Sequence, residues 1–340
     1  MAKPLVTILS PVYNGESYLG YFLDSLLEID YPNLEFILIN DGSSDKTNEV
    51  VKSYQKKLDE KFKRFVYKTT ENKGQAGAVN DGLKLVKGKY LTWPDSDDRL
   101  PKDGVAKMVN YFEKHPDVKL IVGKALTFPE EKMDKAVGIL KRKNHDKQSF
   151  FEDLVIENDV YFCPGSYMID VDAFKKITNM EIYTSRAGQN WQMILPMLYN
   201  YEHHYLDKVV FYYTLRNMSH SREGLKDYEK LSKRYDAHED IIRTTIKNIA
   251  NITKTDIKYY NNLLDIKYAR KRLGIAVLSQ NEDLFNENYN ILKKLNQTTK
   301  LEDKLDQVVT EKRTRIYKKH LLIEKFKRAP KIILNKIIIK

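Results

Sequence analysis

The chain has 340 residues, with 58 lysines and arginines against 47 aspartates and glutamates, and a formal net charge of +11. Hydrophobic residues make up 42% of it and charged residues 31%, which excludes a disordered or collagen-like chain. The single cysteine, Cys163, excludes an intramolecular disulfide framework and a cysteine-rich zinc module, and it fits a reducing cytoplasm.

The excess positive charge is concentrated in residues 311–340. This segment contains 11 lysines and arginines and two acidic residues, whereas the rest of the chain contains 47 basic and 45 acidic residues. A general nucleic-acid binder is expected to be basic over a larger part of its surface. We therefore expect no nucleic-acid partner and assign the charge to a tail.

Short apolar segments alternate with amphipathic segments through the first hundred residues. The expected strands are 5–9, 34–39, 65–68 and 90–93. The expected helices are 18–27, 45–58 and 76–85. This alternation is typical of right-handed βαβ units and predicts an α/β fold with a mostly parallel sheet. Ligands of such sheets bind beyond the carboxyl ends of the strands.

Polar clusters directly follow three of these strands and should converge on one edge of the sheet. The clusters are Pro11-Val12-Tyr13-Asn14, Asp41-Gly42-Ser43 and Asp95-Ser96-Asp97-Asp98. Three carboxylates in four residues raise one another's pKa unless a cation neutralises them, and Mg²⁺ or Mn²⁺ often lies between such carboxylates and substrate phosphates. The alternative for the last cluster is a helix N-cap.

In this order and spacing the chain resembles the inverting family 2 glycosyltransferases of bacterial cell-surface polysaccharide or teichoic-acid synthesis. The resemblance is strong over residues 4–100 and looser over 100–222. It rests on the three clusters, on Ser44-Asp45, on Asn72-Lys73-Gly74 with Ala78-Val79-Asn80, and on Gly88-Lys89-Tyr90. It implies the GT-A fold, a Rossmann-like mostly parallel sheet with flanking helices, followed here by a helical C-terminal extension.

The resemblance also implies roles for single residues. Asp41 would accept a hydrogen bond from a uracil imide, and Asp95 would bind the ribose or sugar side of the donor. Asp97, together with Asp95, would hold Mn²⁺ or Mg²⁺ at the diphosphate. Val79 stands where many relatives have arginine, so one phosphate or ribose contact is expected to be absent. The other expected donor-binding residues are Pro11, Tyr13, Asn14, Glu16, Asn72, Gly74, Asn80 and Ser96.

The family's general base is usually an aspartate in a Glu-Asp pair, and this chain departs from that pattern. Gln189 and Asn190 stand at the matching place, and neither amide takes a proton near neutral pH. The base then comes from elsewhere, with Glu181 and Asp172 as nearest candidates, or the route is metal-assisted or weakly base-dependent. Lost activity is the third alternative, which would leave a catalytically impaired sugar-nucleotide-binding or scaffold protein.

Two further segments carry expected site residues. Trp191 is expected to stack on an acceptor sugar ring, or alternatively to pack in the core, because apolar residues follow it at helical spacing. Arg216, His220 and Arg222 follow an aromatic strand and are expected to contact phosphates, with His220 as a further metal ligand. The alternative for this segment is a solvated basic loop.

We expect three regions: a catalytic domain over 1–225, a helical bundle over 226–310 and a basic amphipathic tail over 311–340. Such a tail favours an anionic membrane surface, and a partner-binding or oligomerisation helix is the alternative. The expected enzyme is a hexosyl- or N-acetylhexosaminyl-transferase at the inner face of the cell membrane. It would transfer the sugar from a UDP-sugar to a glycan, lipid-linked or polyol-phosphate acceptor. It would be an oligomer if the tail binds a second copy of the chain.

Overall fold

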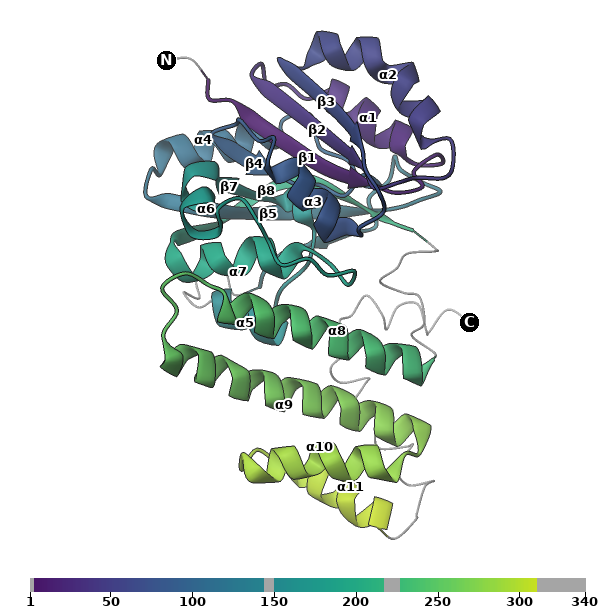
Figure 1. Ribbon diagram of the computed structural model, residues 1–340, viewed down its shortest axis with the longest axis vertical. Coiled ribbons are helices and arrows are strands. Elements are labelled where there is room, and N and C mark those ends of the chain that lie inside the picture. Colours follow the sequence, from purple (N-terminus) through teal and green to yellow (C-terminus); the bar gives the residue numbers. More distant parts are fainter. Residues whose placement is uncertain (1–2, 144–149, 217–226, 311–340) are drawn as a thin grey trace. The chain divides into compact units, whose positions relative to one another are not determined.

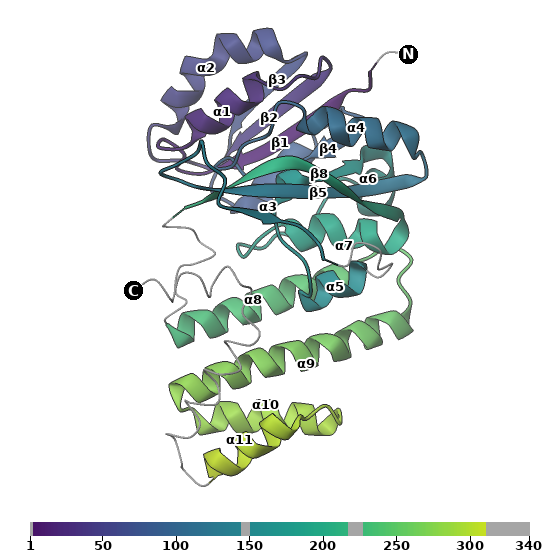
Figure 2. The same ribbon diagram turned by 180° about the vertical axis from the view of Figure 1, so that it is seen from behind.

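The computed structural model describes residues 3–143, 150–216 and 227–310 (Figures 1 and 2). These residues divide into two compact units. The first unit contains the described residues up to 216 together with 240–257, and the second contains 227–239 and 258–310. The domain boundaries expected at 225 and 310 stay predictions, and the basic tail lies outside the described residues.

The first unit is built around one sheet, which has eight strands in the described part of the chain. Its strands are β1 (Val6–Val12), β2 (Leu34–Asn40), β3 (Arg64–Thr69), β4 (Tyr90–Thr92), β5 (Val118–Pro129), β6 (Gly138–Leu140), β7 (Tyr167–Asp170) and β8 (Glu202–Leu215). The strand order is β3-β2-β1-β4-β7-β5-β6, and β8 pairs with β5.

Strands β1 to β4 run parallel, β7 runs antiparallel to β4 and β5, and β8 runs parallel to β5. Short helices connect and flank these strands. They are α1 (Leu19–Leu27), α2 (Thr47–Lys61), α3 (Gln75–Leu83), α4 (Gly104–Lys114), α5 (Phe150–Ile156), α6 (Val171–Thr178) and α7 (Asn190–Asn200). The predicted α/β class with a mostly parallel sheet is confirmed.

The two faces of the sheet are covered by different helices. Helices α1, α2 and α4 lie in front of the sheet in Figure 2, whereas α3 lies in front of it in Figure 1. Successive side chains of β1 point to opposite faces of the sheet. Ile8 joins the core beneath α1, α2 and α4, whereas Leu9 lies against α3. A Cβ on Gly82 would lie 2.1 Å from Leu9 Cδ1, so glycine allows α3 to approach the sheet closely.

A buried carboxylate joins the first three strands. Glu35 in β2 is fully buried, forms an ion pair with Arg64 in β3, and accepts a 2.7 Å hydrogen bond from the Thr7 hydroxyl in β1. It also accepts a hydrogen bond from the backbone N–H of Lys87. A buried charge is tolerated when it is paired and hydrogen-bonded in this way.

The sequence predicted the early elements closely, with one difference that affects the site. β1 does not end at Leu9 but continues through Pro11 to Val12, because Pro11 and Val12 keep parallel register with Ile39 and Asn40. The aromatic strand expected before Arg216 is β8, the long partner of β5.

The second unit is helical. It takes most of α8 (Tyr228–Lys247) and α9 (Lys254–Ser279), together with α10 (Glu282–Lys294) and α11 (Lys300–Thr310). Arg272 of α9 binds Asp236 and Glu239 of α8, and an apolar core joins α9, α10 and α11 around Phe285. The predicted helical C-terminal extension is confirmed. Among the described helices, none combines the length and apolar character needed to cross a bilayer.

Candidate active site

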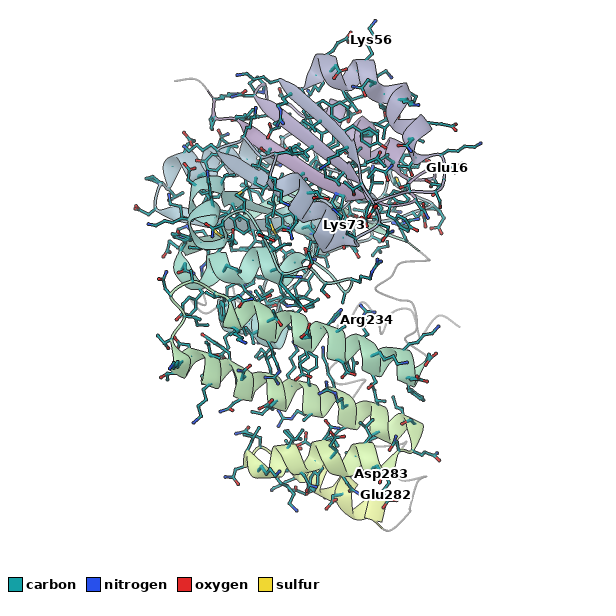
Figure 3. The ribbon with its side chains drawn as sticks, viewed as in Figure 1. Glu16, Lys56, Lys73, Arg234, Glu282 and Asp283 are labelled. Carbon is teal, nitrogen blue, oxygen red and sulfur yellow. The ribbon has the colours of Figure 1, made fainter. Side chains whose placement is uncertain are left out.

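The polar clusters gather at one edge of the sheet. Parallel pairing places Val12 opposite Asn40 and Ile8 opposite Thr92, so the loops after β1, β2 and β4 emerge at the same end. Figure 3 labels Glu16 at this end, in the loop that follows β1. The carboxyl edge of the parallel strands is therefore the candidate site.

The loops after β1 and β2 are bonded to each other. Asn14, with a left-handed φ of 49°, accepts a 2.9 Å hydrogen bond at Oδ1 from the Ser44 backbone N–H. The Glu16 N–H donates to Asp45 Oδ2 at 2.9 Å, and Glu16 Oε2 accepts from the Lys46 N–H at 3.1 Å. The side chains of Asn14 and Glu16 thus fix the wall of the expected nucleotide pocket.

Asp41 lies buried at the end of β2, with 3% of its surface exposed. Its Oδ1 accepts a 2.8 Å hydrogen bond from the Lys73 backbone N–H, which joins the loops after β2 and β3. Gly42 has a φ of 70°, and a Cβ there would lie 2.9 Å from the Asn72 backbone nitrogen. Only glycine allows these two loops to approach so closely.

The loop before α7 reaches the same place. Arg186 donates from its guanidinium to Asn72 Oδ1 at 3.0 Å and to the Asn72 carbonyl at 3.2 Å. Gly74, with a φ of 79°, is the N-cap of α3, and a Cβ there would lie 3.2 Å from Arg186 Cγ. The structure therefore brings the expected residues Asn72 and Gly74 together with Arg186.

Asp95 is held from two helices. Gln75, the first residue of α3, donates its amide Nε2 to Asp95 Oδ1 at 2.5 Å, and Gln189 donates its Nε2 to the same oxygen at 3.4 Å. Burial and the neighbouring charge of Asp97 raise the pKa of the Asp95 carboxyl to about 7. The Asp95 carboxyl is thus protonated more readily than a free aspartate.

Asp97 faces a cation supplied by the end of β8. Arg216 Nη1 lies 3.4 Å from Asp97 Oδ2, while Arg216 Nε lies 3.3 Å from Glu130 Oε1. The guanidinium stacks on the ring of Tyr18, 4.2 Å from its centroid. Burial raises the pKa of the Asp97 carboxyl, although Arg216 acts in the opposite direction. The nearby Ser96 is buried.

Asp98 has a structural role in the site. It is 1% exposed, and its Oδ1 accepts a 2.7 Å hydrogen bond from the Thr214 backbone N–H, which fastens the carboxylate loop to β8. Burial and the charges of Asp97 and Asp95 raise its pKa well above the ordinary value. Its second oxygen, Oδ2, has no hydrogen-bond partner among the described residues.

The carboxylates fit a hard divalent cation. Asp95 and Asp97 supply oxygen donors two residues apart, and burial raises the pKa of both carboxyls, an effect that a bound cation would oppose. In the parts of the chain that the structure describes, no group of three or more histidine, cysteine and acidic residues is placed to hold a metal. Mg²⁺ commonly takes only one or two carboxylates and completes its shell with water and substrate phosphates.

The structure places one of the two expected base candidates, Asp172, away from this site. Asp172 follows β7, which runs antiparallel to β4 and places Asp170 beside Tyr90, the first residue of β4. Asp172 therefore lies at the opposite end of the sheet from Asp95, and its assignment as base is not supported. Glu181 is exposed, in the segment between α6 and α7.

Two other expected residues have partners within the protein. Asn80 is 7% exposed, donates to the Ile182 carbonyl at 2.8 Å and accepts from the Ile182 N–H at 2.9 Å. Trp191 is 5% exposed and packs against Phe162, with ring centroids 4.7 Å apart, which is the core-packing alternative.

Tyr13 is 47% exposed, and His220 and Arg222 lie outside the described residues.

Sequence reasoning missed four residues of this site: Gln75, Tyr18, Glu130 and Arg186. Gln75 lies between Gly74 and the expected helix 76–85, so its position at a helix start was a usable signal. Glu130 lies 86 residues before its partner Arg216, and Arg186 lies 114 residues after Asn72. Such pairings depend on the tertiary fold, and no local pattern marks them.

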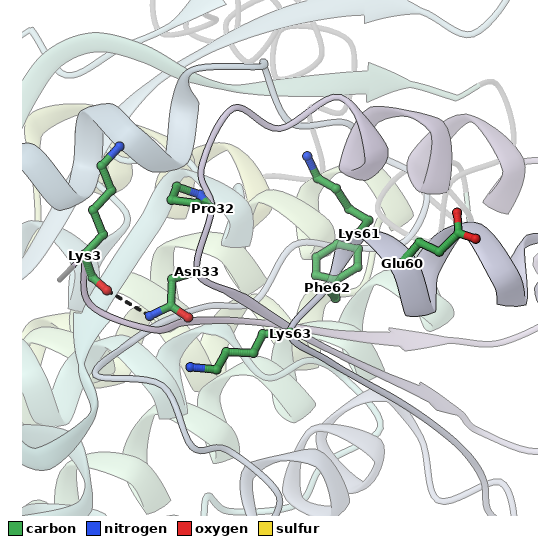
Figure 4. Close-up of a pocket in the computed structure, with 7 residues that line it drawn as sticks. All are labelled: Lys3, Pro32, Asn33, Glu60, Lys61, Phe62 and Lys63. Carbon is green, nitrogen blue, oxygen red and sulfur yellow. Dashed lines mark hydrogen bonds between the residues drawn. The ribbon is translucent and has the colours of Figure 1, made fainter.

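A surface pocket lies at the other end of the sheet. Lys3, Pro32, Asn33, Glu60, Lys61, Phe62 and Lys63 line it (Figure 4). Asn33 Nδ2 donates to the Lys3 carbonyl at 2.8 Å across it, and these residues precede β1, β2 and β3. The pocket is therefore at the amino ends of the parallel strands, away from the carboxylates.

The fold and the site together define an α/β protein with an acidic ligand site at a sheet edge. A family model described as glycosyl transferase family 2 matches residues 7–178, and the chain belongs to this family. An uncharacterized glycosyltransferase of Haemophilus influenzae is 42% identical over 111 residues, which cover 33% of this chain and 43% of that protein. The chain spans only 36–43% of the length of the first three curated relatives that it matches.

Other comparisons extend the likeness. TuaG of Bacillus subtilis, named as a glycosyltransferase of teichuronic acid biosynthesis, is 29% identical over 194 residues, which cover 57% of this chain and 73% of TuaG. The fold is similar to S. aureus TarS 1-349 in complex with UDP-GlcNAc, with a TM-score of 0.61 and 17% identity over 95% of this chain and 91% of that one. A Pyrobaculum calidifontis mannosyltransferase with GDP-Man and Mn²⁺ has a TM-score of 0.55 and 14% identity over 96% of this chain and 85% of that one.

Proposed function

We propose that this protein transfers a sugar, with inversion, from a nucleotide diphosphate, most simply UDP, to a hydroxyl of a cell-surface polymer precursor. The observation that carries the proposal is the Asp95–Asp97 pair beside Arg216 at the carboxyl edge of the parallel strands. The family membership supports transfer of a sugar, and the name of TuaG supports a cell-surface polymer as the product. The UDP-GlcNAc bound to TarS 1-349 supports a UDP-linked donor.

Each part of the site has a distinct task in this proposal. The second oxygen of Asp41 accepts a hydrogen bond from the imide N–H of uracil, since Oδ1 is held by Lys73. Arg216 binds the diphosphate, because a guanidinium tied to Glu130 and stacked on Tyr18 is already positioned for phosphate oxygens.

Asp95 and Asp97 would hold Mn²⁺ or Mg²⁺. A bound divalent ion supplies Lewis-acid stabilisation of the negative charge that develops on the leaving diphosphate. Arg216 orients the Asp97 carboxylate. The side-chain amides of Gln75 and Gln189 orient the Asp95 carboxylate. The acceptor hydroxyl must lose its proton, and the amides of Gln189 and Asn190 do not take it.

The test is release of UDP from UDP-sugars in the presence of Mn²⁺ or Mg²⁺, followed by transfer to a polyol-phosphate or glycan acceptor. Asp97→Ala is expected to abolish transfer and metal-dependent binding of UDP. Turnover in that variant equal to the wild type would rule out the metal assignment. An intact protein that binds UDP but releases none from any UDP-sugar would favour the binding or scaffold alternative.

The acceptor and the location belong to the same proposal. Residues 311–340 carry 11 basic and two acidic residues, a composition suited to anionic lipid headgroups. We place the protein at the cytoplasmic face of the cell membrane, where a glycan, lipid-linked or polyol-phosphate acceptor is within reach. A partner protein or a second copy of the chain is the other occupant that the tail could bind.

A further inference from the structure

Gln189 lies at a constrained position beside the carboxylates. It is the N-cap of α7, follows Gly188 with a φ of 145°, and is only 1% exposed. Gln192 fixes this turn, because its Nε2 donates to the Gly188 carbonyl at 2.7 Å and to the Tyr183 carbonyl at 3.1 Å. The backbone turn that precedes Gln189 is thus held from α7 itself.

The two ends of the Gln189 amide are in different situations. Its Nε2 donates to Asp95 Oδ1 at 3.4 Å, an arrangement that a carboxylate requires because the amide oxygen would be repelled. Its Oε1 is buried and has no hydrogen-bond partner within the described residues. A buried carbonyl without a donor is costly in free energy, so a donor from outside the chain is expected there.

The chemistry of that missing donor follows from the surroundings. An amide oxygen accepts a hydrogen bond without taking the proton. The Gln189 Oε1 atom, next to a carboxylate, therefore suits a neutral O–H donor, which keeps its proton in the hydrogen bond. Carbohydrates supply such groups on both substrates of the proposed transfer. Gln75, in contrast, donates to the same Asp95 oxygen but is partly exposed and leaves no buried oxygen without a donor.

We propose that Gln189 is a specificity residue that bridges Asp95 and a carbohydrate hydroxyl, with its amide nitrogen on the carboxylate and its amide oxygen accepting from the hydroxyl. This inference rests on the proposed function. The hydroxyl belongs either to the donor sugar or to the acceptor, and the two sources give different measurable results. In both cases Gln189, at the place of the family's acidic pair, takes part in recognition and not in proton transfer.

The experiment compares Gln189→Met with Gln75→Met. Both changes remove an amide donor from Asp95 Oδ1, but only the first removes the buried acceptor. Calorimetry with UDP, UDP-glucose and UDP-N-acetylglucosamine in Mn²⁺ gives the ratio of UDP-sugar affinity to UDP affinity. Gln189→Met is expected to lower that ratio about three- to tenfold for the preferred sugar, the effect of one neutral hydrogen bond. Gln75→Met is expected to leave the ratio unchanged.

The other outcomes are equally definite. If the hydroxyl comes from the acceptor, the affinity ratio stays constant and the KM for acceptor rises in Gln189→Met alone. Gln189→Asn keeps both an amide donor and an amide oxygen but withdraws them on a shorter side chain, so it is expected to lower the same ratio or raise the same acceptor KM, which covers the case in which the methionine variant does not fold. An unchanged ratio together with an unchanged acceptor KM overturns the inference while UDP binding still supports the proposed function. Failure of the wild type to bind UDP or any UDP-sugar overturns both.

Discussion

The side chain of Asn80 pairs with the backbone of Ile182 as a neighbouring strand would, donating to the carbonyl at 2.8 Å and accepting from the N–H at 2.9 Å. The two residues are 102 positions apart in the chain. This amide therefore ties α3 to the segment that leads into α7. Gln75 at the start of α3 and Gln189 at the start of α7 both donate to Asp95 Oδ1.

Asn80→Ala is expected to lower the free energy of unfolding by about 1–3 kcal/mol, because it leaves a buried carbonyl and a buried N–H of Ile182 without partners. Asn80→Asp keeps the acceptor but places a carboxylate oxygen against the Ile182 carbonyl. It should therefore destabilise the protein more at pH 7 than near pH 4, where the carboxyl group is protonated. Denaturant unfolding at both pH values measures this, and an unchanged midpoint in the alanine variant would contradict the assigned role.

Asp95→Asn is expected to stabilise the protein at neutral pH. The folded state raises the pKa of Asp95 from 3.8 to about 7, so it binds a proton that the unfolded chain does not bind between those values. The stability cost of the charged carboxylate is full above pH 7 and is lost as the pH falls toward 4. After allowance for solvent screening, the gain above pH 7 is about 2–4 kcal/mol. Thermal melting across pH 4 to 8 should show the two proteins converging at low pH.

Arg216→Ala is expected to weaken binding of UDP about 10- to 100-fold, the effect of losing a charge-assisted hydrogen bond to phosphate. Uridine lacks the diphosphate and serves as the matched ligand, so its affinity should change little. Calorimetry with both ligands separates the two effects. Equal losses for UDP and uridine would show that Arg216 supports the pocket as a whole and does not bind the phosphates.

Asn190→Asp introduces a carboxylate at the place where the resemblance leads us to expect the acidic pair. If proton removal from the acceptor limits the wild type, turnover should rise at least about tenfold and gain an acidic limb in its pH profile. Asn190→Ala is the control for loss of the amide alone. A rate that falls equally in both variants would place the base elsewhere in the protein.

Removal of residues 311–340 is expected to abolish binding to vesicles that contain phosphatidylserine and to leave calorimetric binding of UDP unchanged. The attraction of the full chain to those vesicles should weaken as salt is raised, because basic residues near an anionic surface are screened. Neutral vesicles are the control for apolar insertion. Vesicle binding that survives the truncation contradicts the proposed membrane role of the tail.

The sequence was sufficient for the first half of the sheet because that half is built from local signals. The β-branched runs in β1 and β2 are buried along their whole length, and breaks such as Pro32-Asn33 separate them from the helices. β5 has an apolar run of its own, Leu120-Ile121-Val122, but its pairing with β7 and β8 is set by segments far away in the chain. Asp41 and Asp95 were expected at the carboxyl edge since that edge follows from strand order alone.

The side-chain partners at the site could not be predicted in the same way. Asn80 and Trp191 have the residue types of ligand-binding positions, and only the tertiary structure shows that Ile182 and Phe162 occupy them. Asp172 is near Gln189 in sequence and yet lies at the other end of the sheet, because β7 reverses direction. Sequence distance is a poor guide wherever the chain direction changes between neighbouring strands.

The reciprocal bonds of Asn14 and Glu16 with the loop after β2 have a consequence for the thermodynamics of ligand binding. Two loops that are already fastened to each other do not lose conformational entropy when a nucleotide enters between them. Binding of UDP is then expected to show a small negative heat-capacity change, set by the surface of the ligand itself and not by folding of the pocket wall. Removal of either hydrogen bond would leave the loops free to move before binding, so they would lose conformational entropy when a nucleotide binds.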